Sequence, residues 1–145
     1  MEFILICNFL LGGTAAFLLV PAFTKKHSFR MTLLSLLFLL SIAPTFLLAN
    51  PHIGVLSWTI RDSLLLFAAL FLFYLTFPSS RSKTLLFFLL FLLSIAPLAY
   101  VVYDDFTHTY ADANIRLGLG FLFTWFLTAL YNILAILRFF RQKSQ

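Results

Sequence analysis

The chain contains very little cysteine and very little charge. Cys7 is the only cysteine, so the sequence allows neither an intramolecular disulfide nor a cysteine metal cluster. Charged residues make up 10% of the chain, whereas hydrophobic residues make up 62% and 20 residues are phenylalanine. A chain of this composition has too few charged side chains to cover a water-facing surface. The composition therefore predicts an integral membrane protein.

The chemical motifs of common enzyme classes are also missing. The sequence has no GxSxG, HExxH, P-loop or dinucleotide-binding fingerprint. No charged residue or histidine falls in the centre of a long apolar run, although proton relays and most ion-coupled transporters need such groups there. A haem held between two histidines inside the membrane is disfavoured for the same reason. We therefore expect no cofactor and no metal, and we favour a non-catalytic protein over an enzyme.

What the sequence does contain is five long apolar runs. A helix needs about 20 mostly apolar residues to cross the roughly 30 Å hydrocarbon core of a bilayer. Lipid cannot hydrogen-bond to backbone groups, so each run is expected to be helical. We predict an all-α, polytopic membrane protein with one transmembrane domain over residues 1–145 and five spans in a single bundle. The spans are expected at Phe3–Phe23, Met31–Ala49, Ile60–Phe77, Thr84–Tyr103 and Ile115–Leu137.

Basic residues are concentrated on one side of this five-span topology. Loops on the cytoplasmic side of membrane proteins carry an excess of lysine and arginine, which predicts an outer N-terminus and a cytoplasmic C-terminus in a cell inner (plasma) membrane. The first span is preceded only by Glu2 and lacks the basic region of a signal peptide, so we expect it to be retained. The net charge of +5 is expected to bind anionic lipid headgroups at the cytoplasmic face and not nucleic acid. The residues on the basic side are Lys25, Lys26, Arg30, Arg81, Lys83, Arg138, Arg141 and Lys143.

The nine residues LLFLLSIAP occur twice without a change, at 36–44 and at 89–97. This identity predicts an internal duplication of two helical hairpins, repeat A over residues 31–77 and repeat B over residues 82–137. Both copies would start in the cytoplasm, so they would be parallel repeats, with the first helix as an addition.

Each copy of the repeated segment ends in a proline that is expected to bend its helix. Pro44 and Pro97 lack an N–H and crowd the preceding turn. Ser41 and Ser94 stand one turn earlier and are expected to bond to the nearby backbone. The two bends would splay the outer ends of the second and fourth spans and open a crevice there. Packing that simply tolerates the bends is the favoured alternative.

Two helices carry stripes of small and polar residues at a spacing of four. Such stripes let another helix approach closely in a membrane, either within the chain or from a partner. Internal packing is slightly favoured for the fifth helix. The first helix, which lies outside the duplication, is the better candidate for a membrane-protein partner or for self-association. The stripes are Asn8, Gly12 and Ala16 on the first helix and Gly120, Thr124, Thr128 and Asn132 on the fifth.

The outer ends of the spans hold the one group of residues that suggests chemistry. Carboxylates and imidazoles can bind a divalent cation or serve as acid and base when a fold brings them together. A solvated loop with Arg–Asp pairs at the membrane surface is the favoured alternative. The low-priority catalytic candidates are His108, Asp104, Asp105, Arg116, His52 and Arg61.

The ends of the third and fifth spans carry possible helix caps. Thr59 and Asp62 resemble a capping box, which would place Arg61 in the first turn of the third span at headgroup depth. Asp112 is expected to cap the fifth helix. The threonine-rich segment after Asp104 is not expected to be helical.

Three classes of function fit this sequence. The favoured class is a non-catalytic accessory, scaffold or lipid-contacting subunit of a membrane assembly. The second is a membrane-embedded enzyme with its site at the outer leaflet, using Asp104, Asp105 and His108. The third is a channel or facilitator formed by oligomerisation, although the apolar middles of the second, third and fourth spans make a continuous polar path hard to build.

Overall fold

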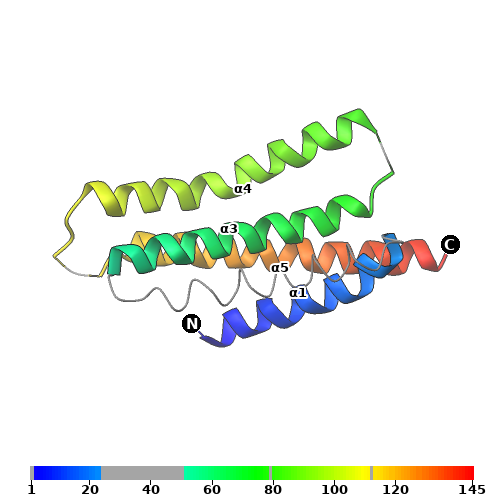
Figure 1. The fold of residues 1–145 in the computed structure, drawn as a ribbon, viewed down its shortest axis with the longest axis horizontal. Helices are drawn as coiled ribbons and strands as arrows, with labels where there is room; N and C mark the ends of the chain where they lie inside the picture. Colours follow the sequence, from blue (N-terminus) through cyan, green and yellow to red (C-terminus); the bar gives the residue numbers. More distant parts are fainter. Residues whose placement is uncertain (1, 24–50, 79, 112) are drawn as a thin grey trace.

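A computed structural model describes residues 2–23, 51–78, 80–111 and 113–145 of the chain. The described residues form helices and no strand, which confirms the all-α prediction. The expected second span, with Ser41 and Pro44, lies outside the described residues, so the five-span count stays a prediction. The described helices are α1 (Glu2–Phe23), α3 (Pro51–Leu75), α4 (Arg81–Thr107) and α5 (Ile115–Lys143), as shown in Figure 1.

Three of these helices contain stretches that are long and apolar enough to cross a membrane. They lie at Gly54–Leu75, Ser82–Thr107 and Ile115–Lys143, and α1 contributes a shorter apolar stretch at Ile6–Ala22. This part of the prediction is therefore supported at the level of a multi-pass membrane protein. Which membrane it occupies stays a prediction.

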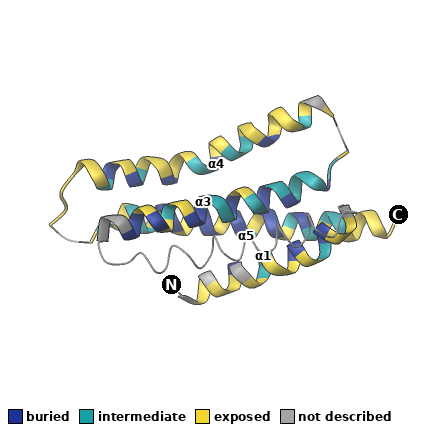
Figure 2. Cartoon of the chain, in the orientation of Figure 1, coloured by how far each residue is buried: buried dark blue, intermediate teal, exposed yellow. Residues whose placement is uncertain are grey.

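The bundle is built around the pair formed by α3 and α5. Helix α1 packs against α5 and α3, helix α4 packs against the same two, and α1 and α4 do not touch each other. Figure 1 accordingly shows α1 and α4 on opposite sides of the central pair, with α4 running against the direction of α1, α3 and α5. The buried residues in Figure 2 concentrate on the faces that these helices turn toward one another.

Helix α3 begins at Pro51 and not at Ile60, so the predicted start of the third span was wrong. Proline suits the first position of a helix, where its missing N–H would have no partner anyway. Further along, the Thr59 hydroxyl donates to the Val55 carbonyl at 2.7 Å, as threonine does inside a helix. The expected capping box of Thr59 and Asp62 is therefore absent.

The N-cap of α5 is Asn114, whose side-chain oxygen accepts from the Leu117 N–H at 3.2 Å. The prediction that Asp112 caps this helix was wrong, and the placement of Asp112 lies outside the described residues. Asparagine is as good an N-cap as aspartate, because its side-chain oxygen can reach an otherwise unpaired N–H of the first turn.

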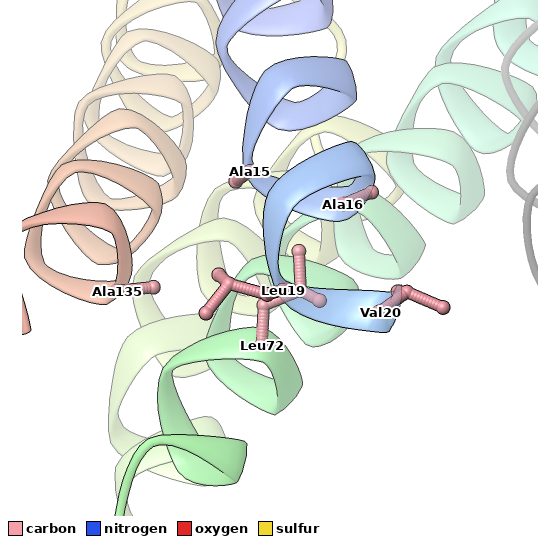
Figure 3. Close-up of a cluster of buried hydrophobic side chains, with 6 residues drawn as sticks. All are labelled: Ala15, Ala16, Leu19, Val20, Leu72 and Ala135. Carbon is pink, nitrogen blue, oxygen red and sulfur yellow. The ribbon is translucent and has the colours of Figure 1, made fainter. Parts of the chain in front are cut away.

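Three apolar clusters lie along the interior of the bundle. The cluster shared by α1, α3 and α5 is rich in alanine, which lets helix backbones approach closely (Figure 3). A second cluster joins α3, α4 and α5 around Leu98 and Trp125, and a third joins the same helices around Leu66 and Phe87. The first cluster consists of Ala15, Ala16, Leu19, Val20, Leu72 and Ala135.

The repeated segment that the structure describes lies in α4, and it binds across to α5. The Ser94 hydroxyl shares a 2.9 Å hydrogen bond with the Tyr131 hydroxyl. The expected bond from Ser94 to its own backbone stays a prediction. Tyr131 is buried and needs a polar partner for its hydroxyl, which Ser94 supplies. Pro97 lies inside the helix. In Figure 1 the first half of α4 diverges from α3 toward Arg81.

Candidate functional site

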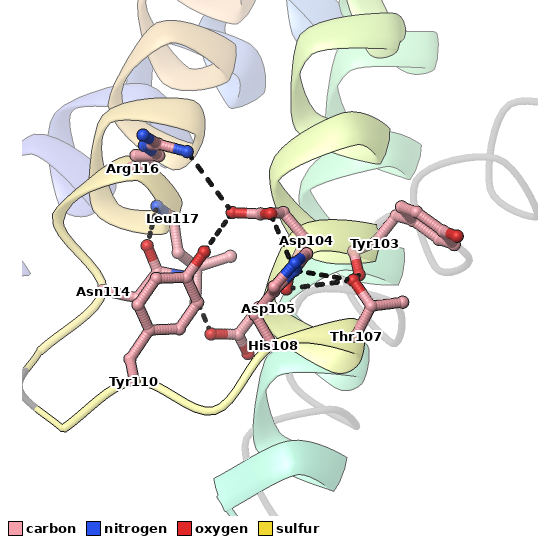
Figure 4. Close-up of polar contacts among 9 residues, drawn as sticks. All are labelled: Tyr103, Asp104, Asp105, Thr107, His108, Tyr110, Asn114, Arg116 and Leu117. Atoms are coloured by element: carbon pink, nitrogen blue, oxygen red, sulfur yellow. Dashed lines mark hydrogen bonds and ion pairs between the residues drawn. The ribbon is translucent and has the colours of Figure 1, made fainter.

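The predicted outer cluster is centred on Asp104, close to the C-terminal end of α4 (Figure 4). Its buried carboxylate accepts a hydrogen bond from the Tyr110 hydroxyl and lies 3.1 Å from Nδ1 of His108. A guanidinium nitrogen of Arg116 lies 3.9 Å from the same carboxylate. The structure thus brings together three of the six catalytic candidates. They meet because α4 continues to Thr107, so the expectation of a non-helical segment after Asp104 was wrong.

Asp105 belongs to the neighbouring part of this loop and has a different partner. One of its carboxylate oxygens accepts from the Asn114 side-chain amide at 2.9 Å. This bond ties the end of α4 to the N-cap of α5, because the same Asn114 side chain caps the first turn of α5. Asp105 therefore closes the α4–α5 connection and does not join His108.

The charged groups of this cluster stabilise the loop between α4 and α5. The His108 and Arg116 side chains are 67% and 70% exposed, so water solvates both partners of Asp104. The hydrogen bond to the Asp104 carboxylate raises the pKa of Tyr110 above its usual value of 10.0, because the phenol must stay protonated to donate. Among the residues that the structure describes, no three His, Cys, Asp or Glu side chains gather in a way that could hold a metal ion.

Arg61 pairs with Asp62 and not with the Asp104 cluster, and it lies further inside its helix than the sequence predicted. Because α3 starts at Pro51, Arg61 is about 10 Å beyond Gly54, inside the apolar stretch, and it is buried. Its Nε donates to the carboxylate of Asp62 at 2.8 Å. The side chain of the remaining candidate, His52, lies outside the described residues.

The buried pair of Arg61 and Asp62 is completed by Trp125, which the sequence did not single out, and Trp125 in turn contacts Asn8 of the first-helix stripe. The indole N–H of Trp125 donates to the second Asp62 oxygen at 2.8 Å, and the Trp125 carbonyl accepts from the Asn8 amide at 2.9 Å. These contacts connect α1, α3 and α5 at one level of the bundle. One signal for the pair was available, since an arginine next to an aspartate is neutral overall and is easier to bury than either charge alone.

The two stripes of small and polar residues are turned into the chain, and they meet at Gly12 and Asn132. On α5, the Thr124 and Thr128 hydroxyls donate to carbonyls one turn earlier, at 2.9 and 2.8 Å. A Cβ built on Gly12 of α1 would lie 3.5 Å from the Asn132 amide nitrogen. The first-helix residues expected to meet a partner therefore pack on α5 instead. Asn8, Ala16, Gly120, Thr124, Thr128 and Asn132 are all buried, and Gly12 is half-buried.

The clearest pocket lies at the opposite end of α4 from Asp104. It has a volume of about 240 Å³ and sits between the end of α3 and the start of α4. Leucine and aromatic side chains form most of its wall, and Lys83 lies at its edge. Sequence reasoning had placed a crevice at the outer ends of the second and fourth spans. Because the second span lies outside the described residues, that crevice stays a prediction.

Comparisons with known proteins do not assign the chain to a family. No family model, curated protein or solved structure matches the chain. The described residues form helices whose apolar stretches are compatible with a multi-pass membrane protein.

Proposed function

We propose that this chain is a non-catalytic accessory or scaffold subunit of a membrane assembly, and that α4 is the helix through which it meets its partner. The observation that carries the proposal is the small buried share of α4. Only 22% of its most apolar stretch is buried within the chain, against 44% for α3 and 39% for α5. Of these three candidate spans, the most apolar is therefore the one least covered by the rest of the chain.

The uncovered face of α4 is a continuous apolar stripe. Its members recur at helical spacing, opposite the side that carries Phe87, Ser94, Leu98 and Val102. In a bilayer such a face costs little to leave in lipid, and a partner helix gains contact by van der Waals packing against it. The exposed side chains of the stripe are Leu85, Leu89, Leu92, Leu93, Tyr100 and Tyr103.

The polar groups of the described helices support a structural role. Asp104 already contacts Tyr110, His108 and Arg116, and Asp62 is bonded to Arg61 and Trp125. An acid, base or metal ligand needs a group that is free to contact substrate, whereas these carboxylates hold helices together. An enzyme at the outer leaflet is therefore less well supported, although Asp104, His108 and Arg116 do meet.

A channel through this chain has little support either. The polar stripe of α5 is buried within the chain, with Thr124 and Asn132 only 0% and 2% exposed. A polar path would require that these helices separate.

Photo-crosslinking in native membranes tests the proposed partner. A benzophenone amino acid would be placed at Leu89 or Leu92 of α4. Phe126 of α5 is the control because it is comparably exposed, at 63% against 53% for Leu89 and 63% for Leu92. The two α4 positions should each give one discrete protein adduct of the same partner. The Phe126 position should give lipid adducts.

Two outcomes would contradict the proposal. If the α4 positions yield only lipid adducts, α4 faces lipid and the proposal of a partner on α4 is wrong. If His108→Ala abolishes a measurable turnover in these membranes while the adducts are absent, the enzyme alternative replaces the subunit.

A further inference from the structure

The pocket between α3 and α4 has the walls of a site for a hydrocarbon chain. Leu70 and Phe73 of α3 face Phe87 and Leu90 of α4 across it, in a volume of about 240 Å³. Phe87 is 7% exposed and packs edge-on against Phe67 at 5.3 Å, so the inner wall is held by aromatic contacts. A pre-formed apolar cavity with few polar groups at its edge is typical of small-molecule and lipid sites.

Two cations contact Phe77, which lines this pocket: Lys83 is itself a lining residue, and Arg138 packs against the Phe77 ring from the neighbouring end of α5. The Lys83 ammonium donates to the Phe77 carbonyl at 2.5 Å, and the Arg138 guanidinium lies 3.9 Å from the centre of the Phe77 ring. An ammonium has three donors, so Lys83 keeps donors beyond this bond. The Nε of Arg138 is buried and has no hydrogen-bond partner among the described residues. The Lys83 ammonium also lies 4.0 Å from the centre of the Tyr74 ring, so Lys83 and Arg138 place two positive charges beside the aromatic wall of the pocket.

The positive charge at this end is not balanced within the described part of the chain. Among the described residues, Arg61, His108 and Arg116 form ion pairs, whereas Lys83 and Arg138 form none. The end of α5 adds a hollow of about 280 Å³ lined by Arg138, Arg141, Gln142 and Gln145. It adjoins the end of α3, because the Gln142 amide donates to the Thr76 carbonyl at 2.6 Å.

We propose that this pocket binds an anionic phospholipid, with an acyl chain between α3 and α4 and the phosphate against Lys83 and Arg138. An apolar cavity and a basic rim side by side match the two halves of such a lipid, and basic pockets between membrane helices are known to hold anionic headgroups. The inference rests on the proposal that the chain is an integral membrane protein. It does not depend on the partner of α4.

Native mass spectrometry of the full-length detergent-solubilised protein tests the site directly. The probes are phosphatidylglycerol and phosphatidylcholine with the same acyl chains. Phosphatidylglycerol should be retained more tightly. Lys83→Gln and Arg138→Gln should each weaken its binding about fivefold, as expected for the loss of one basic contact. Lys143→Gln removes the same charge near the end of the chain, away from the pocket lining, and should change the affinity less than twofold.

A change in shape tests the acyl chain separately from the charge. Leu90→Trp fills the pocket while keeping its basic rim, and should weaken retention of both lipids. Leu86→Trp, at a half-exposed lining position, serves as a second version should Leu90→Trp fail to fold, as judged by helix content and gel filtration. Glycerophosphate without acyl chains should not displace bound phosphatidylglycerol.

Several results would overturn the lipid site. These are equal retention of the two lipids, equal effects of Lys83→Gln and Lys143→Gln, unchanged retention in both tryptophan variants, or displacement by glycerophosphate alone. Membrane fractionation reports on the proposed function independently. A chain that is absent from the membrane fraction would refute the proposed function, whereas a membrane-bound chain without lipid preference would refute only this inference.

Discussion

Two carboxylates of this chain have similar partners at different depths. Asp62 lies inside α3 and is bonded to Arg61 and the indole of Trp125, whereas Asp104 lies near the end of α4 beside Arg116 and the phenol of Tyr110. The side chain of Arg61 is 7% exposed and that of Arg116 is 70% exposed. Both carboxylates are buried, but water already solvates the exposed partners of Asp104, whereas Arg61 and Trp125 are buried with Asp62. The difference teaches that depth, more than the identity of the partners, decides how much each pair contributes.

Removal of Arg61 should give the largest effect. Arg61→Met leaves the Asp62 charge buried without its cation, and should lower the free energy of unfolding by about 3–5 kcal/mol. The double change Arg61→Met with Asp62→Leu should recover much of this loss, because it removes both charges. Unfolding in mixed detergent micelles, followed by tryptophan fluorescence, measures both variants. If Arg116→Met costs as much as Arg61→Met, the argument from depth is wrong.

Removal of the aromatic hydrogen-bond donors should give a smaller difference in unfolding free energy between the two sites. Trp125→Phe removes a hydrogen bond to a buried carboxylate and should cost about 1.5–3 kcal/mol, since bonds to charged groups are the stronger ones. Tyr110→Phe removes the corresponding bond to Asp104 and should cost clearly less, because Tyr110 is exposed and water competes for its hydroxyl. The same unfolding assay compares them. Equal losses would mean that Asp104 is as isolated from water as Asp62.

Packing between α4 and α5 should matter independently of either charge. A Cβ on Gly120 would overlap the Val101 side chain of α4, whereas Gly118 has no neighbour within 4 Å. Gly120→Ala should therefore cost about 1–3 kcal/mol by overpacking. Gly118→Ala should be neutral or slightly stabilising, because alanine favours the helix. If the two alanine variants behave alike, α4 does not approach α5 as closely as the structure shows.

The smallest effect should appear at alkaline pH and only at the Asp104 end. The pKa of Tyr110 is raised by its hydrogen bond to Asp104, so the stabilisation is present below pH 10 and is lost as the pH rises through the folded-state pKa. The wild-type chain should therefore lose more stability above pH 10 than Tyr110→Phe does. Unfolding curves at a series of pH values measure the difference. If the stabilities of the two proteins change with pH in parallel, the Tyr110–Asp104 hydrogen bond does not contribute to stability.

The sequence predicted helices well where one physical cause dominates. Long apolar runs must be helical in lipid, and α4 and α5 accordingly contain the whole of the expected spans. Helix ends were predicted poorly. The segment from Pro51 to Thr59 contains proline, glycine and hydroxyl residues that are typical of loops, yet it is the beginning of α3.

The candidate site was predicted in part. Asp104, His108 and Arg116 do meet, because a spacing of four residues puts Asp104 and His108 on one face once α4 extends to Thr107. Arg61 was assigned to the wrong depth, because its position depends on where α3 begins. The contact from Trp125 to Asp62 spans 63 residues of sequence, and no local pattern reports such a pair.

The sequence by itself determined the class of this protein and the helical state of its long apolar segments, because the hydrophobic effect and backbone hydrogen bonding act on composition and length. Only the tertiary structure decided which stripe faces which helix, that Arg61 and Asp62 are buried, and that a pocket opens at the basic end of α4. Those features depend on contacts between residues far apart in the chain. The apolar composition explains why helices form, and the packing of α1, α3, α4 and α5 decides where the few polar groups meet.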